Sequence, residues 1–184
     1  MSLGKLAKDG IQTIEMEAKE VECLGDKTSI LIYGEDIIDN LTVLNAIASK
    51  ISRQKVGAFI SYEHELTYNR NNLEVFEILP SQYDEQTDFL EMLSKTGTEW
   101  AVFDRVDANN LPFIMKTLRS GSPTASLTCF NSKDLIGLFD GLGLPTTESR
   151  QRMNEFNGED TKCLLIQVTK DESGKLMIKS VDVK

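Results

Sequence analysis

The sequence predicts an α/β domain in which a mostly parallel sheet is covered by helices on both faces. Short apolar runs alternate with segments of helical periodicity, which is typical of strand–helix–strand units and a parallel sheet. The chain closes with CLLIQVTKDESGKLMIKSVDVK, two strand-like runs around a polar turn, which predicts an antiparallel hairpin at one edge. The 184 residues suit one domain with a sizeable core, so residues 1–184 are interpreted as a single domain.

The first elements follow from periodicity. An apolar face at helical spacing predicts a leading helix over residues 11–24, with acidic residues opposite. The apolar face consists of Ile11, Ile14, Ala18 and Val21. Residues 1–10 are interpreted as a tag or a linker. Residues 28–33 are almost uniformly apolar and predict a buried strand that ends at Gly34. The next helix is expected to begin near Asn40, because apolar residues recur from there at helical spacing.

The middle of the chain repeats this alternation. Residues 56–61 form a short apolar run, residues 73–79 alternate, and residues 100–103 are uniformly apolar, so each predicts a strand. Helical periodicity predicts helices over residues 82–94 and 109–118. Residues 124–130 predict another strand, and the Asn-Ser-Lys-Asp that follows can cap a helix, which the segment GLGLP at 141–145 then ends.

Composition excludes several functions. The net charge is −9 and the basic residues are scattered, which argues against nucleic acid and against an anionic membrane surface. No apolar run reaches membrane-spanning length and no secretory signal is recognisable, so no membrane insertion is expected. Three dispersed cysteines and a single histidine indicate reduced thiols and no zinc or His-rich metal site, as in a cytoplasmic protein.

The segment between the first strand and the next helix lies where a phosphate-binding loop would lie. It reads GEDIIDNLT from Gly34 to Thr42, with acidic residues and no lysine. Beside a polyphosphate at ~4 Å, with an effective dielectric constant near 20, each carboxylate costs roughly 4 kcal/mol before screening. Carboxylates suit a helix N-terminus instead, since its unpaired N–H groups carry partial positive charge. Asp36, Asp39 or Asn40 is therefore expected to cap the helix.

The order of segments resembles the C-terminal, RecA-like motor domain of the type II and type IV secretion ATPases. The family motif ILISGGTGSGKTTLLNAL is similar to ILIYGEDIIDNLTVLNAI in this chain. Gly34 and Thr42 match. Asp39, Asn40 and Leu41 stand where the family has its second glycine, its lysine and its magnesium-binding serine or threonine. The resemblance implies a three-layer P-loop NTPase fold.

The acidic motifs of the family also have counterparts. Glu63 in SYEHELTY matches its acidic box, and Asp104 in WAVFDRVD replaces the glutamate of its second acidic strand. Val75 and Leu79 stand where the family has arginines, and Cys129 replaces a histidine. If the site retains any function, Glu63 and Asp104 are the remnants that would hold magnesium or position water. The plainer interpretation is that both are acids left at strand ends.

These substitutions predict a secretion-ATPase homologue with a decayed ATP site, which serves as a non-hydrolytic assembly or regulatory component. No cofactor is expected. Its expected partners are copies of itself, an active secretion ATPase or another secretion-system protein, in the cytoplasm or at the periphery of a secretion complex. Two alternatives remain open: a divergent active ATPase that binds Mg-ATP weakly, and an unrelated α/β protein-binding module.

Overall fold

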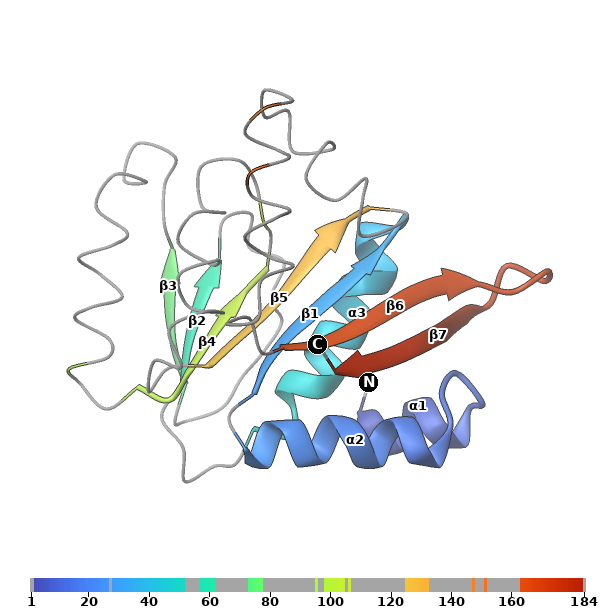
Figure 1. Cartoon of the computed structure of the whole chain (residues 1–184), viewed down its shortest axis with the longest axis horizontal. Coiled ribbons are helices and arrows are strands. Elements are labelled where there is room, and N and C mark those ends of the chain that lie inside the picture. Colours follow the sequence, from blue (N-terminus) through green and yellow to red (C-terminus); the bar gives the residue numbers. More distant parts are fainter. Residues whose placement is uncertain are drawn as a thin grey trace.

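A mixed sheet forms the centre of the molecule (Figure 1). The computed structural model describes residues 2–26, 28–51, 57–61, 73–77, 98–104, 125–132 and 163–183, with residues 95, 106, 147 and 151. The strands are β1 (Ser29–Gly34), β2 (Gly57–Ser61), β3 (Leu73–Glu77), β4 (Trp100–Phe103), β5 (Ala125–Asn131), β6 (Cys163–Lys170) and β7 (Leu176–Val183). Their order in the sheet is β3-β2-β4-β5-β1-β6-β7.

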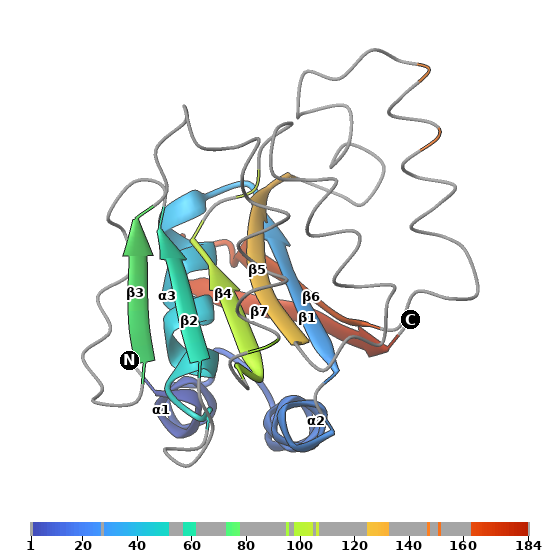
Figure 2. The ribbon, with the colours of Figure 1, turned by 90° about the vertical axis from the view of Figure 1, so that its left-hand side faces the viewer.

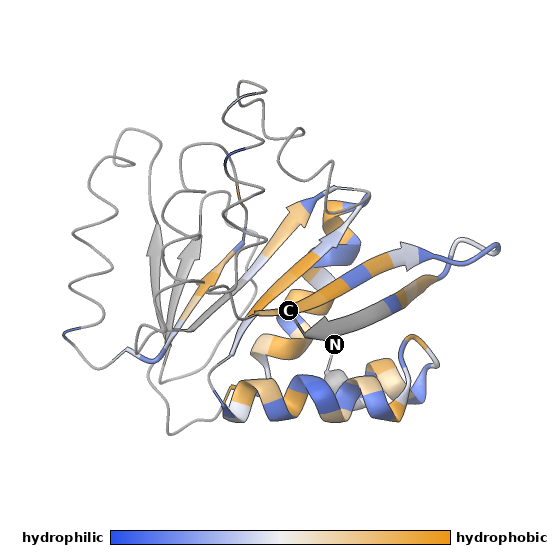
Figure 3. Cartoon of the chain, in the orientation of Figure 1, coloured by the Kyte–Doolittle hydropathy of each residue, from blue (hydrophilic) through white to orange (hydrophobic). Residues whose placement is uncertain are grey.

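All strands up to β6 pair in parallel, and only β7 is antiparallel to its neighbour. The predicted α/β class with a mostly parallel sheet and a C-terminal hairpin is therefore confirmed, with β6 belonging to the parallel part. Strand β1 lies between β5 and β6 and is buried along its whole length, which explains its uninterrupted apolar sequence (Figure 3). The carboxyl ends of the parallel strands meet at one edge of the sheet.

The hairpin between β6 and β7 is closed by the side chain of Asp171. Its Oδ1 accepts hydrogen bonds from the backbone N–H groups of Ser173 and Lys175, each at 2.9 Å. Gly174 has φ +81°, a left-handed conformation that glycine adopts without strain. The Asp-x-x-Gly pattern thus produces the turn that the sequence predicts.

The N-terminal residues fold onto the hairpin. Helix α1 (Leu3–Lys8) occupies most of the segment expected to be a tag or linker, and its Leu6 is completely buried in the core. After it, Ile11 O accepts a hydrogen bond from Ile178 N at 2.8 Å, and Asp9 O accepts one from Lys175 Nζ at 2.6 Å. Residues 9–11 therefore cover part of the outer edge of β7. The linker interpretation missed this packing because one buried leucine gives no periodic signal.

Helix α2 (Ile14–Gly25) begins three residues later than expected, after Thr13, whose hydroxyl accepts a hydrogen bond from Met16 N at 3.2 Å. Its orientation differs more from the prediction. Ile14 and Val21, expected in the core, are 76% and 45% exposed, while Glu20 is completely buried. Ile11, the remaining large member of the predicted face, is buried but lies before the helix.

Helix α3 (Ile37–Ala48) packs on β5 and β1 and supplies much of the apolar core (Figure 2). In the same view, α1 and α2 lie together at the end of the sheet opposite the carboxyl ends of its parallel strands. The helices expected over residues 82–94 and 109–118, which a three-layer arrangement requires on the other face, lie outside the described residues.

Candidate functional site

The candidate site is the junction of β1 with α3, where the sequence predicts a degenerate phosphate loop. Only Glu35 and Asp36 connect the strand to the helix, which begins at Ile37. The expectation of a helix starting near Asn40 is therefore wrong by three residues. Residues 37–41 belong to the first turns of α3 and do not form an open loop that could surround a phosphate.

Asp36 is the N-cap of α3, which confirms one of the capping alternatives. Its Oδ1 accepts hydrogen bonds from Ile38 N at 2.9 Å and, at 3.4 Å, from Asp39 N. The cap residue is extended, with φ −113° and ψ 115°, as N-cap geometry requires. A carboxylate of the chain thus satisfies N–H groups that a phosphate occupies in anion-binding helices.

Lys170 links the hairpin to this helix end. Its Nζ lies 2.7 Å from Asp36 Oδ2 and 3.1 Å from Asp39 Oδ2, across 134 positions from the capping residue. The hydrogen bond from Lys170 lowers the pKa of Asp36 below its ordinary value of 3.8, and the same carboxylates raise the pKa of Lys170. Sequence reasoning missed Lys170, because nothing local to residue 170 indicates a contact with α3.

Asn40, at the position of the family's lysine, is completely buried. Its amide nitrogen donates to Gly34 O at 3.0 Å and to Phe130 O at 2.7 Å, so it holds together the ends of β1 and β5. It is neither the cap nor a group that reaches the surface. A side chain fixed by two backbone carbonyls inside the core has a structural role here.

Gly34 is packed too closely to carry a side chain. A Cβ built at this residue would lie 2.6 Å from Asn40 Oδ1 and 2.6 Å from the carbonyl oxygen of Val168 on β6. Its own carbonyl also accepts a hydrogen bond from Ser132 N at 2.9 Å, beyond the end of β5. The glycine that matches the family's first loop glycine therefore serves close packing among three strands.

Leu41 and Thr42, the remaining matched positions of the predicted phosphate loop, also make contacts within the fold. Leu41, at the magnesium-binding position, is buried in the apolar core. Thr42 donates its hydroxyl to Ile38 O at 2.8 Å, one turn earlier in the same helix. Within the described residues, no cluster of His, Cys, Asp or Glu has the arrangement of a metal site.

Asp104 follows β4 and is completely buried. Its backbone carbonyl accepts a hydrogen bond from Cys129 Sγ at 3.2 Å. In the sheet, β5 separates β4 from β1, so Asp104 is displaced from the α3 junction by two strand spacings, about 10 Å. Asp104 therefore does not lie next to the junction. The other acidic candidate, Glu63, lies outside the described residues.

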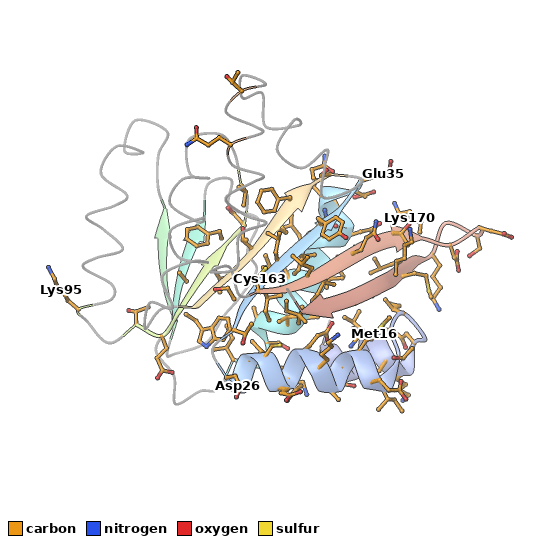
Figure 4. The ribbon with its side chains drawn as sticks, viewed as in Figure 1. Met16, Asp26, Glu35, Lys95, Cys163 and Lys170 are labelled. Atoms are coloured by element: carbon orange, nitrogen blue, oxygen red, sulfur yellow. The ribbon has the colours of Figure 1, made fainter. Side chains whose placement is uncertain are left out.

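A cavity of about 430 Å³ opens beside the junction. It is lined by Glu35, Asp36, Asp39, Gln167, Val168, Thr169, Lys170 and Lys179. Figure 4 shows Glu35 and Lys170 at the same side of the molecule, above β1 and at the end of β6. Lys170 contacts two of these carboxylates, and Lys179 adds a second cation to the lining. The cavity is thus mixed in charge.

Comparison with known proteins identifies solved structures that are similar to this fold. Neither a family model nor a curated protein matches the sequence. The VirB11 ATPase from the Brucella suis type IV secretion system aligns with 99% of this chain at TM-score 0.66 and 12% identity, over 56% of its own length. The ATPase DotB of Yersinia pseudotuberculosis aligns with 94% at TM-score 0.56 and 12% identity, over 46% of its length.

The pilus retraction motor PilT, solved with bound ADP, aligns with 90% of the chain at TM-score 0.54 and 11% identity, over 50% of its length. The chain thus spans about half the length of these structures. Of the described residues, none forms a helix long and apolar enough to cross a membrane. In fold, the chain is similar to the secretion and pilus-motor ATPases over most of its residues, with the α/β arrangement of a P-loop ATPase domain.

Proposed function

We propose that the chain is a homologue of the type II and type IV secretion ATPases in which the ATP site is closed, and that it acts as a non-hydrolytic assembly or regulatory component. The observation that carries this proposal is the closed junction: a two-residue connection, capped by Asp36 and bridged by Lys170. Any phosphate at this helix end would displace a carboxylate from its N–H groups.

The energetics support a closed site. P-loop hydrolysis depends on backbone N–H groups, a lysine, a metal ion and an arginine that together neutralise the phosphates. At this junction Asp36 occupies the N–H groups, Asn40 is tied to two carbonyls, and Leu41 is in the core. Glu35 and Asp39 add like charge beside the same helix end. The helix N–H groups, the lysine position and the metal-binding position are therefore all engaged by contacts within the chain.

The proposed partners are copies of this chain, an active secretion ATPase or another secretion-system protein, in the cytoplasm or at the periphery of such a complex. The similarity in fold to VirB11 and PilT supports this choice. Sedimentation velocity of the purified chain tests self-association, and a shift on adding a purified secretion ATPase tests the heterologous partner.

A divergent active ATPase is the second candidate, and the cavity beside the junction favours it. Lys170 and Lys179 line the cavity, and a rearranged Lys170 could face a phosphate there. Thr42, Glu63 and Asp104 would then be the remaining catalytic groups. The third candidate is an unrelated α/β binding module. A strand order different from that of the secretion ATPases would favour it, and the similarity in fold to VirB11 offers no such support.

Calorimetric titration with Mg-ATP separates the first two candidates. The native chain and the variant Lys179→Ala are titrated up to millimolar nucleotide, with Glu172→Ala on the exposed hairpin turn as a control. A closed site gives no saturable heat with any of the three proteins. Saturable binding that Lys179→Ala weakens and Glu172→Ala leaves unchanged would refute the closed site and establish the cavity as a nucleotide site.

A further inference from the structure

The outer face of α2 carries an apolar stripe that nothing in the described chain covers. Its members are Ile14, Ala18, Val21 and Gly25, all exposed. Figure 1 shows α2 along the lower border of the molecule, and Figure 3 shows apolar and hydrophilic stretches alternating along it. Met16, labelled in Figure 4, instead packs against the core with Cys23 and Leu24, so the helix has a second, buried apolar face.

The spacing within this stripe is that of a coiled-coil seam. Steps of four, three and four residues correspond to heptad positions d, a, d and a. From Ile14 to Gly25 the stripe is about 16 Å long, three helical turns. Ala18 and Gly25 have small or absent side chains, which allows the backbone of a second helix to approach closely. The stripe therefore has the geometry for one partner helix and not for a flat surface.

The residues beside the stripe define the charge of that partner. The flanking e positions are Glu15 and Glu22, both exposed, and the first g position is Glu17. Among the described residues, Lys50 Nζ lies 3.9 Å from a carboxyl oxygen of Glu17. Charges at e and g positions select partners, so a helix with lysine or arginine at its own flanking positions would fit both edges.

A second copy of α2 does not fit this surface. In a parallel pair, Glu17 would face Glu22 of the other copy, and in an antiparallel pair Glu15 would face Glu22. Both arrangements place two glutamates opposite each other, which is destabilising. The net charge of −9 adds a long-range preference for a cationic partner.

We propose that the outer face of α2 is the docking surface for a basic amphipathic helix of another protein, which packs Ile14, Ala18, Val21 and Gly25 into its seam and pairs its flanking cations with Glu15, Glu17 and Glu22. This surface lies at the opposite end of the sheet from the α3 junction, as the positions of Asp26 and Glu35 in Figure 4 show. Docking here would leave the junction and its cavity accessible.

The test uses a labelled synthetic peptide of three heptads, with isoleucine and leucine at the seam and lysine at the flanking positions. Its binding to the full chain is measured by fluorescence anisotropy. Ile14→Asp is expected to weaken binding at least tenfold. Ile38→Asp is the matched control, because Ile38 is 71% exposed on α3, away from α2, and the change in charge is identical.

A second pair of variants separates docking from net charge. Glu22→Lys is expected to weaken binding of the lysine-flanked peptide about tenfold, whereas Glu172→Lys, on the hairpin turn, changes it less than twofold. Absence of binding, or equal losses within either pair of variants, overturns the proposal. Sedimentation that shows a dimer of the native chain and a monomer of Ile14→Asp would also overturn it, because the occupant would then be a second copy.

Discussion

A carboxyl group buried under α2 gives the stability of the fold a specific dependence on pH. Glu20 is completely buried and accepts a hydrogen bond from Gln12 Nε2 at 3.2 Å. Within the described residues, the second carboxyl oxygen of Glu20 and the amide oxygen of Gln12 have no hydrogen-bond donor. A proton on Glu20 would turn its carboxyl oxygen from an acceptor into a donor. This environment therefore favours the neutral acid over the carboxylate.

The magnitude follows from the pKa. Burial, with a further contribution from the charge of Glu17, raises the pKa of Glu20 from 4.5 to about 7, against the hydrogen bond from Gln12. Between these two values the folded state binds more protons than the unfolded state, so the free energy of unfolding falls as pH rises. Over 7 − 4.5 = 2.5 pH units, the change is about 3 kcal/mol. It is complete above about pH 7.

Replacing Glu20 by glutamine removes this titration and retains a side chain of similar volume. Urea unfolding is followed at half-unit steps from pH 4.5 to 8 by the fluorescence of Trp100, the single tryptophan, which is buried. The free energy of unfolding of Glu20→Gln minus that of the native chain should rise by about 3 kcal/mol across this range. Glu22→Gln, exposed on the same helix, is the control for the loss of one acidic side chain.

A flat difference for Glu20→Gln would refute the reasoning. It would mean that Glu20 reaches water and that α2 turns its Ile14 and Val21 face to the core, as the periodicity of the sequence predicts. The docking surface proposed for α2 would then not exist. The same titration therefore tests the orientation of the helix and the premise of the further inference.

Substitutions at three residues of the α3 junction test its packing. Gly34→Ala should destabilise the fold by about 1–3 kcal/mol in urea unfolding, because the new Cβ would overlap Asn40 Oδ1 and Val168 O, and an unchanged midpoint would contradict the close packing. Asn40→Ala should cost about 2–4 kcal/mol in the same assay, since two buried carbonyls lose their donor. Asp36→Ala should lower the melting temperature at pH 7 more than Asp36→Asn, which keeps a capping oxygen. The loss in melting temperature of Asp36→Ala relative to the native chain should shrink as pH falls below 3.8 toward the lowered pKa of Asp36, because the native carboxylate is then protonated. Equal melting temperatures of Asp36→Ala and the native chain at pH 7 would show that the cap contributes nothing.

The sheet was predictable from the sequence because its signals are local. Buried parallel strands such as β1 and β4 are uninterrupted apolar runs, and the hairpin has the Asp-x-x-Gly turn. The start of α3 had a local signal as well: Asp36 followed by two isoleucines and Asp39 is a capping pattern. The alignment with the family's phosphate loop assigns residues 35–38 to the loop. The predicted start of the helix was therefore placed after these residues.

The rest depends on contacts between distant residues. Lys170 reaches Asp36 across 134 positions, and no property of either segment alone indicates that contact. The orientation of α2 is a competition between two faces, one with Ile14 and Val21 and the other with Met16, Cys23 and Leu24. Periodicity favours the face with Ile14 and Val21, whereas the structure buries the other. The outcome depends on the shape of the surface formed by α1 and β7, against which the helix packs.

The contact of residues 9–11 with β7 has a consequence for how the protein is made. Asp9 and Lys175, which are joined by a hydrogen bond, are 166 positions apart, so the ribosome adds Lys175 long after Asp9. Until β7 is complete, Ile11 has no strand to pair with, and Leu6 lacks part of its surroundings. The edge of the sheet also stays open during that interval, when unpaired strand edges are prone to aggregate.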